Sequence, residues 1–158
     1  MIFIIKLRQF TISDIDFILN NWSNTKRIKG CSFPGNAKQL TRIISEWDTK
    51  SCQGKYFEQF AVLDNECIVG MISLYEVNAS SVSVGVIIDK KYYRNGYAEE
   101  ALNLIKEVAK SKGYNKLVST SRINNYGSIK LHEKCKFNNQ GKSINKKGNE
   151  IYSWNYEL

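Results

Sequence analysis

The sequence predicts a mixed α/β fold, in which a central sheet of parallel and antiparallel strands has helices on both faces. Apolar segments with strand-like alternation lie near both ends and in the middle of the chain, and segments with helical spacing separate them. Their order is β-α-α-β-β-β-α-β-α-β-β. The strand–helix–strand unit in the second half requires a right-handed parallel crossover, so helices should cover the sheet. The 158 residues suit one domain, which we expect to span residues 1–158.

The first part of the chain predicts one strand followed by two amphipathic helices. Residues 2–10 form the expected strand, and Thr11 with Asp14 three residues later resembles a capping box at the start of the first helix. Asn36 is placed to cap the second helix. Each helix carries an apolar stripe at i, i+3, i+4 and i+7 spacing, namely Ile15, Ile18, Leu19 and Trp22 in the first and Leu40, Ile43, Ile44 and Trp47 in the second.

Three strands are expected to follow as a meander. Residues 56–63 and 67–77 are strand-like, and residues 64–66 between them give a hairpin signal. A polar turn at residues 78–81 leads into the third strand, whose alternate residues are Val82, Val84, Val86 and Ile88. The near-continuous apolar end of this strand, residues 84–88, predicts that it is buried on both faces.

The second part of the chain begins with the best-defined helix, which follows Gly96. One of its faces carries Ala98, Ala101, Leu102, Ile105, Val108 and Ala109. Gly113 lies just past its end and suits a left-handed cap. A strand at residues 117–123, a helix that starts near Asn125 and two closing strands complete the order. The closing strands are expected at residues 140–145 and 150–157, joined at residues 147–149.

Composition limits the partners of this chain. A formal net charge of +8 fits a nucleic acid, an anionic cofactor or an anionic substrate, while the scattered lysines favour a solvated basic face. The four cysteines form no CxxC pair and there is one histidine, so we expect reduced, mostly buried thiols and no metal site. No apolar run approaches ~18 residues and the N-terminal segment lacks the order of a secretion signal, which predicts a cytoplasmic protein without a membrane partner.

The junction at Gly96, between a strand and a long helix, suits an anion. A helix start leaves backbone amide hydrogens without partners, and the helix dipole is positive there. Arg94, Lys90 and Lys91 add positive charge nearby. The chain has no Walker A motif and no GxGxxG fingerprint, which argues against a nucleotide held by those motifs. On these grounds alone, a glycine used only for tight packing remains an equal alternative.

The residues at this junction resemble the GNAT superfamily of N-acetyltransferases. Residues 93–98, with the sequence YRNGYA, are similar to the family's pyrophosphate loop, Q/R-x-x-G-x-G/A. Gly96 and Ala98 occupy the matching positions, and Tyr93 stands where glutamine or arginine is usual.

Two further stretches resemble the same family. Residues 125–137, with the sequence NYGSIKLHEKCKF, are similar to its second block, with Lys136 in place of the usual glycine. Residues 5–22 resemble the start of the ribosomal-protein-alanine acetyltransferase-like branch. The resemblance covers essentially the whole chain, although a fold-level likeness names no acceptor.

The resemblance implies acetyl-CoA as co-substrate. Backbone amides of residues 94–98 would cradle its pyrophosphate. The pantetheine arm would lie along the strand that ends at residues 86–88, where a backbone amide would face the thioester carbonyl. Asn125 would contact the same arm, or cap the helix, or do both. The implied cofactor-binding residues are Val86, Ile87, Ile88, Tyr93, Arg94, Asn95, Gly96, Tyr97, Ala98, Asn125 and Ser128.

Direct attack by an amine, as the resemblance implies, requires one group that accepts a proton and one that donates a proton to the CoA thiolate. His132 occupies the position where many members have a tyrosine acid. The branch often has a glutamate base at the position of Ser83, so Glu76 on the preceding strand becomes the nearest carboxylate by topology. A water chain without a single base is an alternative, and Tyr75 or Tyr97 could line the acceptor side.

The acceptor is left open by the sequence. Candidates are a protein N-terminal amine, a polyamine, an amino sugar or an antibiotic amine, and the positive charge disfavours a polycation. The acceptor pocket should lie near the first two helices, with residues 23–35 as its variable wall and Trp22, Lys29, Phe33 and Trp47 in or near that region. We expect both tryptophans to belong to the core. The competing reading is a non-catalytic CoA- or RNA-binding module on the same fold. Nucleic acid is expected only indirectly, and a homodimer is possible.

Overall fold

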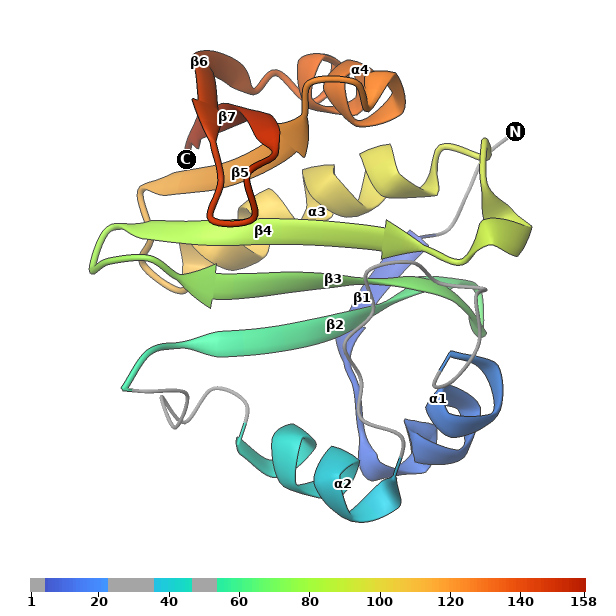
Figure 1. Cartoon of the computed structure of the whole chain (residues 1–158). Helices are drawn as coiled ribbons and strands as arrows, with labels where there is room; N and C mark the ends of the chain where they lie inside the picture. The colour runs from blue at the N-terminus through green and yellow to red at the C-terminus, as the bar shows by residue number, and fades with distance from the viewer. Residues whose placement is uncertain (1–4, 23–35, 47–53) are drawn as a thin grey trace.

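The computed structural model describes residues 5–22, 36–46 and 54–158, which form one seven-stranded mixed sheet flanked by helices (Figure 1). The order of strands in the sheet is β1-β2-β3-β4-β5-β7-β6. The strands are β1 (Ile5–Gln9), β2 (Phe57–Asp64), β3 (Cys67–Glu76), β4 (Ser81–Ile88), β5 (Lys116–Arg122), β6 (Asn138–Ile144) and β7 (Glu150–Glu157). The helices are α1 (Ile15–Asn21), α2 (Ala37–Glu46), α3 (Tyr97–Ser111) and α4 (Tyr126–Lys134), with short 3-10 turns at Ile12–Asp14 and Lys90–Tyr92. The predicted order of strands and helices is confirmed.

The sheet consists of two antiparallel halves that one short parallel contact joins. Strands β1 to β4 form the first half, and β5, β7 and β6 form the second. Between the halves, β4 and β5 pair only where Ser81, Val82 and Ser83 face Lys116, Leu117 and Val118. Beyond these pairs β4 continues to Ile88 paired only with β3, while β5 stays paired with β7, so the two strands diverge.

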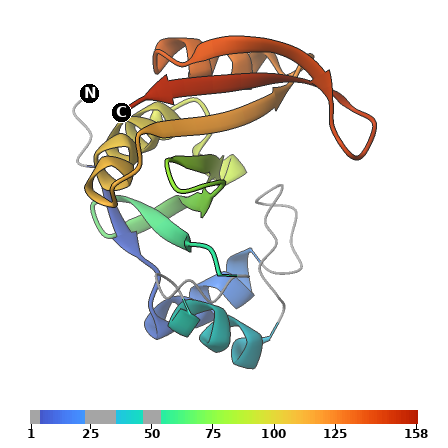
Figure 2. The ribbon, with the colours of Figure 1, turned by 90° about the vertical axis from the view of Figure 1, so that its left-hand side faces the viewer.

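Helices cover both faces of the sheet, as the sequence predicts (Figures 1 and 2). Helices α1 and α2 place Ile15, Ile18 and Leu40 in one core cluster with residues of β2 and β3. On the opposite face, α3 packs Ala101, Leu102 and Ile105 against the second and larger cluster, which continues under α4 to Trp154 of β7. The stripes predicted for the helices are therefore the surfaces that they bury.

Local capping signals explain where several helices begin and end. The backbone N–H of Thr11 donates to the carboxylate of Asp14, over 2.8 Å. Asn36 accepts from the backbone N–H of Gln39 at the start of α2, also over 2.8 Å. Gly113 follows α3 with a φ of 92°, which is the left-handed conformation expected of a C-terminal cap.

Three expectations need correction. The apolar end of β4 is not buried on both faces, because Gly85 is exposed and its two neighbours, Val86 and Ile87, are half-buried. Strand β6 is Asn138–Ile144, slightly earlier than the sequence indicates. Of the two cysteines that the structure describes, Cys135 is buried as expected, but Cys67 is exposed. Strand residues 2–4 and the predicted site residues Lys29, Phe33 and Trp47 lie outside the described residues.

Candidate active site

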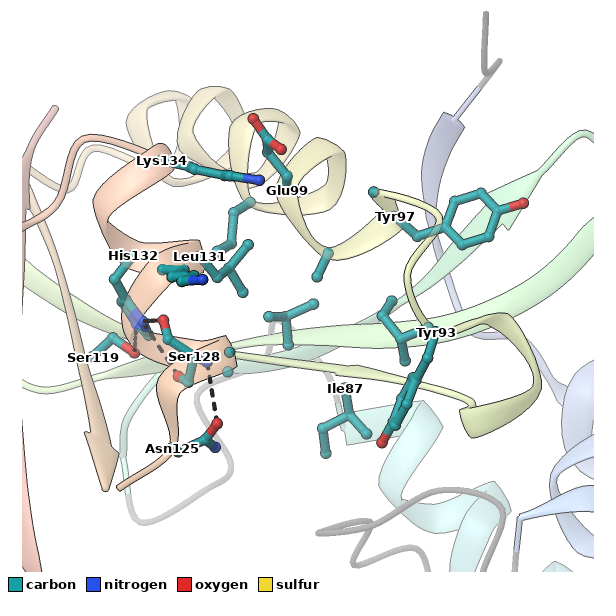
Figure 3. A pocket seen from close by; sticks show the side chains of 18 of the residues that line it. Ile87, Tyr93, Tyr97, Glu99, Ser119, Asn125, Ser128, Leu131, His132 and Lys134 are labelled. Carbon is teal, nitrogen blue, oxygen red and sulfur yellow. Dashed lines mark hydrogen bonds between the residues drawn. The ribbon is translucent and has the colours of Figure 1, made fainter. Parts of the chain in front are cut away.

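A cavity of about 900 Å³ lies where β4 and β5 diverge (Figure 3). Strand β4 and the loop that follows it form one wall, the first turns of α3 another, and β5 with α4 the third. Val86 and Ile87 at the end of β4 line this space, and they pack against the core clusters on opposite faces of the sheet. All of the cofactor residues implied by the sequence line the cavity, namely Val86, Ile87, Ile88, Tyr93, Arg94, Asn95, Gly96, Tyr97, Ala98, Asn125 and Ser128.

The loop before α3 has the backbone geometry of an anion site. Arg94 and Gly96 both have left-handed dihedrals, with φ values of 65° and 80°. Asn95 between them donates its side-chain amide to the carbonyl oxygens of Tyr92 and Tyr93, over 3.0 and 3.2 Å, which holds the loop in this form. Gly96 is the N-cap of the 15-residue helix α3. A concave run of amides at the positive end of a long helix can bind phosphate.

Tyr97 lines the cavity with its backbone, while its ring points away from it (Figure 3). Its hydroxyl donates to the carboxylate of Asp64 at the β2–β3 turn, over 2.6 Å. This hydrogen bond raises the pKa of Tyr97 from 10 to about 12, and burial and the charge of Asp64 act in the same direction. Tyr97 therefore ties the start of α3 to the first half of the sheet. A role for its side chain at the acceptor is not supported by this orientation.

Asn125 is the N-cap of α4, where its side-chain oxygen accepts from the backbone N–H of Ser128 over 3.1 Å. Asn125 therefore caps the helix, as one of the two expected roles, and it also lines the cavity. At the other end of α4, Lys136 adopts a left-handed φ of 67° where a glycine is usual. The turn thus keeps the glycine-like conformation despite the larger residue.

His132 projects from α4 toward β5, and both of its ring nitrogens have partners. Nδ1 lies 2.7 Å from the carbonyl oxygen of Ser128, and Nε2 lies 2.8 Å from the hydroxyl oxygen of Ser119. Trp154 stacks on the ring at 5.0 Å between centroids, and Phe137 packs edge-on at 5.3 Å. With 5% of its surface exposed, His132 is buried, and this burial lowers its pKa below the ordinary 6.5, although the bond to Ser128 opposes the shift. The imidazole is therefore neutral at neutral pH.

The structure does not bring Glu76 to the cavity. Its carboxylate accepts from the hydroxyl of Tyr114 over 2.7 Å, beyond the C-terminal end of α3. Ser83 does line the cavity, whereas Tyr75 packs edge-on against Phe57. Among the described residues of the lining, Glu99 is the one carboxylate, and it lies in the first turn of α3.

Sequence reasoning missed several residues of the site. Ser119 reaches His132 from β5, and Lys130 and Lys134 of α4 add positive charge to the lining. The two lysines are spaced i, i+4 on α4, a regularity that could have been noticed. The sequence does not single out Ser119, because it is the first of three consecutive hydroxyl residues on β5 and any of them could have faced the cavity. Trp22 is buried in the core, as expected for this tryptophan, and its ring N–H donates to Asp89 over 3.1 Å.

Comparisons with known proteins agree with this geometry. The family model described as "Acetyltransferase (GNAT) domain" matches residues 5–138. The structure resembles a variant of the spermidine N-acetyltransferase SpeG from Vibrio cholerae, with 18% identity, a TM-score of 0.75 and coverage of 97% of this chain and 93% of that one. The same enzyme solved with CoA and spermine gives 18% identity, a TM-score of 0.74 and coverages of 97% and 95%.

A third similar structure comes from Salmonella typhimurium. It is an acetyl transferase that modifies the N-terminal serine of a 50S ribosomal subunit protein. Its identity to this chain is 13%, with a TM-score of 0.72 and coverage of 98% of this chain and 95% of that one. A search of curated proteins found no significant match. At these identities the solved structures support the fold, and the family model supports the family.

The chain belongs to the GNAT family of acetyltransferases. Its class is an acetyl-CoA-dependent N-acetyltransferase, and acetyl-CoA is its co-substrate. None of the helices in the described part of the chain is long and apolar enough to cross a membrane.

Proposed function

We propose that this protein transfers the acetyl group of acetyl-CoA to a primary amine by direct attack of the amine on the thioester. The observation that carries the proposal is the cavity between the diverging strands, which has an amide-rich, positively charged loop at one end. In the proposal, residues 94–98 bind the pyrophosphate and β4 pairs with the pantetheine arm through Val86 to Ile88. Asn125 and Ser128 approach the arm from α4. The whole chain, residues 1–158, acts as one catalytic domain.

For the acceptor, we propose an N-terminal amine of a protein rather than a polyamine. The opening residues resemble the ribosomal-protein-alanine acetyltransferase-like branch, which supports this choice. A chain with a net charge of +8 also repels a polycation and attracts an anionic partner. A cytoplasmic location belongs to the same proposal, in keeping with the reduced thiols of Cys67 and Cys135. A homodimer is compatible with it, although no interface is assigned.

Within this function, His132 remains the proposed catalytic residue from the second block, and Glu76 is given no role. A neutral imidazole whose Nδ1 faces a carbonyl oxygen cannot itself supply a proton from that atom to the thiolate. The proposal therefore assigns proton transfer to Nε2, the nitrogen that faces Ser119 and the cavity.

A thermal-shift titration with acetyl-CoA tests the cofactor site. A ligand that binds only the folded protein stabilises it by about 2.7 kcal/mol at a hundredfold excess over Kd. We expect such a shift with acetyl-CoA and a smaller one with adenosine 3′,5′-bisphosphate, which lacks the pantetheine arm. Gly96→Val should abolish both shifts, because a β-branched residue is strained at a φ of 80° and would displace the loop.

Gly113→Val is the matched control, since Gly113 has a φ of 92° at the other end of α3 and lies outside the cavity. It should lower the melting temperature of the protein without removing the shift. Absence of any shift at millimolar acetyl-CoA would contradict the proposal. A titration with RNA at rising salt would then distinguish the RNA-binding alternative, because binding through phosphates weakens steeply with salt.

A further inference from the structure

We infer that Ser119 and His132 form a proton shuttle at the thioester end of the cavity, which takes a proton from the attacking amine and returns it to the departing CoA sulfur. The inference rests on the proposed function and adds Ser119 as a second catalytic residue. It also explains how proton transfer proceeds although Glu76 lies outside the cavity and Ser83 cannot serve as a base on its own.

The hydrogen bonds around His132 determine which nitrogen carries the proton. The carbonyl oxygen of Ser128 can only accept, so Nδ1, at 2.7 Å from it, must be the donor. Nε2 of a neutral imidazole is then an acceptor, and the hydroxyl of Ser119 donates to it over 2.8 Å. Because the single hydroxyl hydrogen of Ser119 points at His132, the lone pairs of its oxygen are left to face the cavity that Ser119 lines.

Ser119 occupies the closed end of the space between β4 and β5. The last pair between these strands joins Ser83 and Val118, and Ser119 is the next residue of β5. The phosphate-binding loop follows the far end of β4, after Ile88. A cofactor held at that loop, with its arm extended along β4, therefore carries its thioester toward Ser83 and Ser119 rather than away from them.

The surroundings of His132 keep the imidazole neutral, so Nε2 carries no proton before the amine arrives. Trp154 and Phe137 cover the ring, and burial lowers its pKa. The charged residues of the surrounding cavity wall are Arg94, Glu99, Lys130 and Lys134. Three of these are cations and one is a carboxylate. The hydroxyl of Ser119 lies within hydrogen-bond reach of His132, and the carbonyl of Ser128 orients the imidazole. This arrangement activates a hydroxyl for proton transfer.

The shuttle balances the reaction. The neutral amine forms a bond to the thioester carbon, and as its nitrogen becomes positive one N–H proton passes to the oxygen of Ser119. The hydroxyl proton of Ser119 passes to Nε2 at the same time, which leaves an imidazolium held by Ser128. When the carbon–sulfur bond breaks, the proton on Nε2 returns through Ser119 to the thiolate. The products are the N-acetylated amine and CoA, and both residues regain their starting states.

Kinetics of four variants test the shuttle, with thiol release from acetyl-CoA as the signal. The acceptors are spermidine, glucosamine and a peptide with a free N-terminal alanine. Ser119→Ala and His132→Gln should each lower kcat by about 100-fold or more, the usual contribution of acid–base catalysis. The double variant should lose no more than either single one, because the two residues act as a unit. Ser119→Thr, which keeps a hydroxyl, should recover most of the rate.

Binding measurements separate this inference from the proposed function. The Kd of acetyl-CoA, measured by calorimetry, should change less than about threefold in Ser119→Ala, because the proposed binding residues are intact. Ser143→Ala replaces a serine on the exposed strand β6 in the same way. It is the control for the loss of a hydroxyl and should leave kcat unaltered. An active wild type whose rate is preserved in Ser119→Ala overturns the shuttle and leaves the proposed function standing. A wild type that neither binds acetyl-CoA nor turns over any of the three amines overturns both.

The single histidine of the chain provides a readout that needs no acceptor. In ¹⁵N-labelled protein, the nitrogen spectrum should show a protonated Nδ1 and an unprotonated Nε2, and the Nε2 signal should move in Ser119→Ala. CoA should also move the Nε2 signal, whereas adenosine 3′,5′-bisphosphate, which has no sulfur, should not. A protonated Nε2 in the free protein, or equal responses to the two ligands, would contradict the assignment.

Discussion

At the scale of single residues, Tyr97 and His132 show how the same site uses its ring side chains in opposite ways. Tyr97 turns its ring away from the cavity and bonds to Asp64, so its contribution is to hold the loop before α3. His132 turns inward, where burial and two hydrogen bonds fix its charge and its tautomer. Residue type alone would have suggested the reverse, because a tyrosine is the usual acid of the family that the sequence resembles.

Tyr97→Phe removes one hydrogen bond to a carboxylate and should lower the free energy of unfolding by about 1–2 kcal/mol. The difference between wild type and variant should depend on pH. In the unfolded chain tyrosine ionises near 10, whereas the pKa of folded Tyr97 is about 12. The stabilisation is therefore complete below pH 10 and is lost as the pH rises toward 12. Urea denaturation of both proteins across this range measures it, and a constant difference would contradict the assignment.

The ionisation of His132 makes the stability of the protein depend on pH in the acidic range. Its folded pKa is lowered below 6.5 by burial, so the unfolded chain binds the proton more readily. Stability is therefore complete above pH 6.5 and decreases as the pH falls through the folded pKa. In His132→Gln, urea denaturation between pH 7 and pH 5 should show a smaller loss of stability than in wild type. An equal loss in both proteins would show that other groups dominate this range.

At the scale of elements, α4 combines a structural and a binding role in its first residue. Asn125 caps the helix through its side-chain oxygen and also lines the cavity. Asn125→Ala should lower the free energy of unfolding by about 1 kcal/mol, because the cap is lost. Asn125→Ser keeps a capping oxygen and should restore stability.

The same pair of Asn125 variants separates the two roles. If the amide group also contacts the pantetheine arm, the serine variant should still bind acetyl-CoA more weakly than wild type. Calorimetric titration of the two variants measures this directly. Wild-type affinity in Asn125→Ser would assign the residue to capping alone.

Strands β3 and β4 are packed closely at Gly70, directly behind the cavity wall. A Cβ atom there would overlap the carbonyl oxygen of Ile87 and lie 2.9 Å from the Cα of Ile88. Gly70→Ala should therefore lower stability by roughly 3 kcal/mol or more, since backbone atoms must move. Gly85→Ala, on β4, is the control, because its Cβ would lie 3.4 Å from the hydroxyl oxygen of Ser73. Urea denaturation should show the smaller loss for Gly85→Ala, and equal losses would contradict the packing argument.

At the scale of the whole molecule, two antiparallel half-sheets meet at a contact three residue pairs long. The strands that leave this short contact form two walls of the cavity. The net positive charge of the chain attracts an anionic cofactor such as acetyl-CoA. The fold thus provides a site open at one end and an electrostatic field that favours its ligand.

If electrostatic attraction speeds the binding of acetyl-CoA, the association rate should depend on the salt concentration. Raising the ionic strength from about 0.01 M to about 0.15 M shortens the screening length from about 30 Å to about 8 Å. The association rate of acetyl-CoA in stopped-flow fluorescence should fall several-fold, with a smaller change in dissociation. Lys134→Gln in the cavity wall should reduce this dependence more than Lys146→Gln outside it. Equal effects would show that net charge, not its position, controls the encounter.

Much of the fold could be predicted from local sequence. The order of elements, the caps at Asn36 and Gly113 and the strand–glycine–helix junction all follow from spacing and from conformational preferences within a few residues. The residues proposed to bind the cofactor come from three short stretches of sequence, and the structure places all of them on the lining of one cavity. The apolar end of β4 was misread as a two-sided core strand, since a strand that lines a ligand cavity and a fully buried strand have the same composition.

The sequence by itself therefore determined the succession of strands and helices and the place where a phosphate could bind. Only the tertiary structure decided which side chains meet across the cavity. Ser119 and His132 are on different elements, and Glu76 does not line the cavity but accepts a hydrogen bond from Tyr114. The physical reason is that periodicity and capping act between near neighbours in the chain. The meeting of β5 with α4, and the divergence of β4 from β5, result from packing between distant segments.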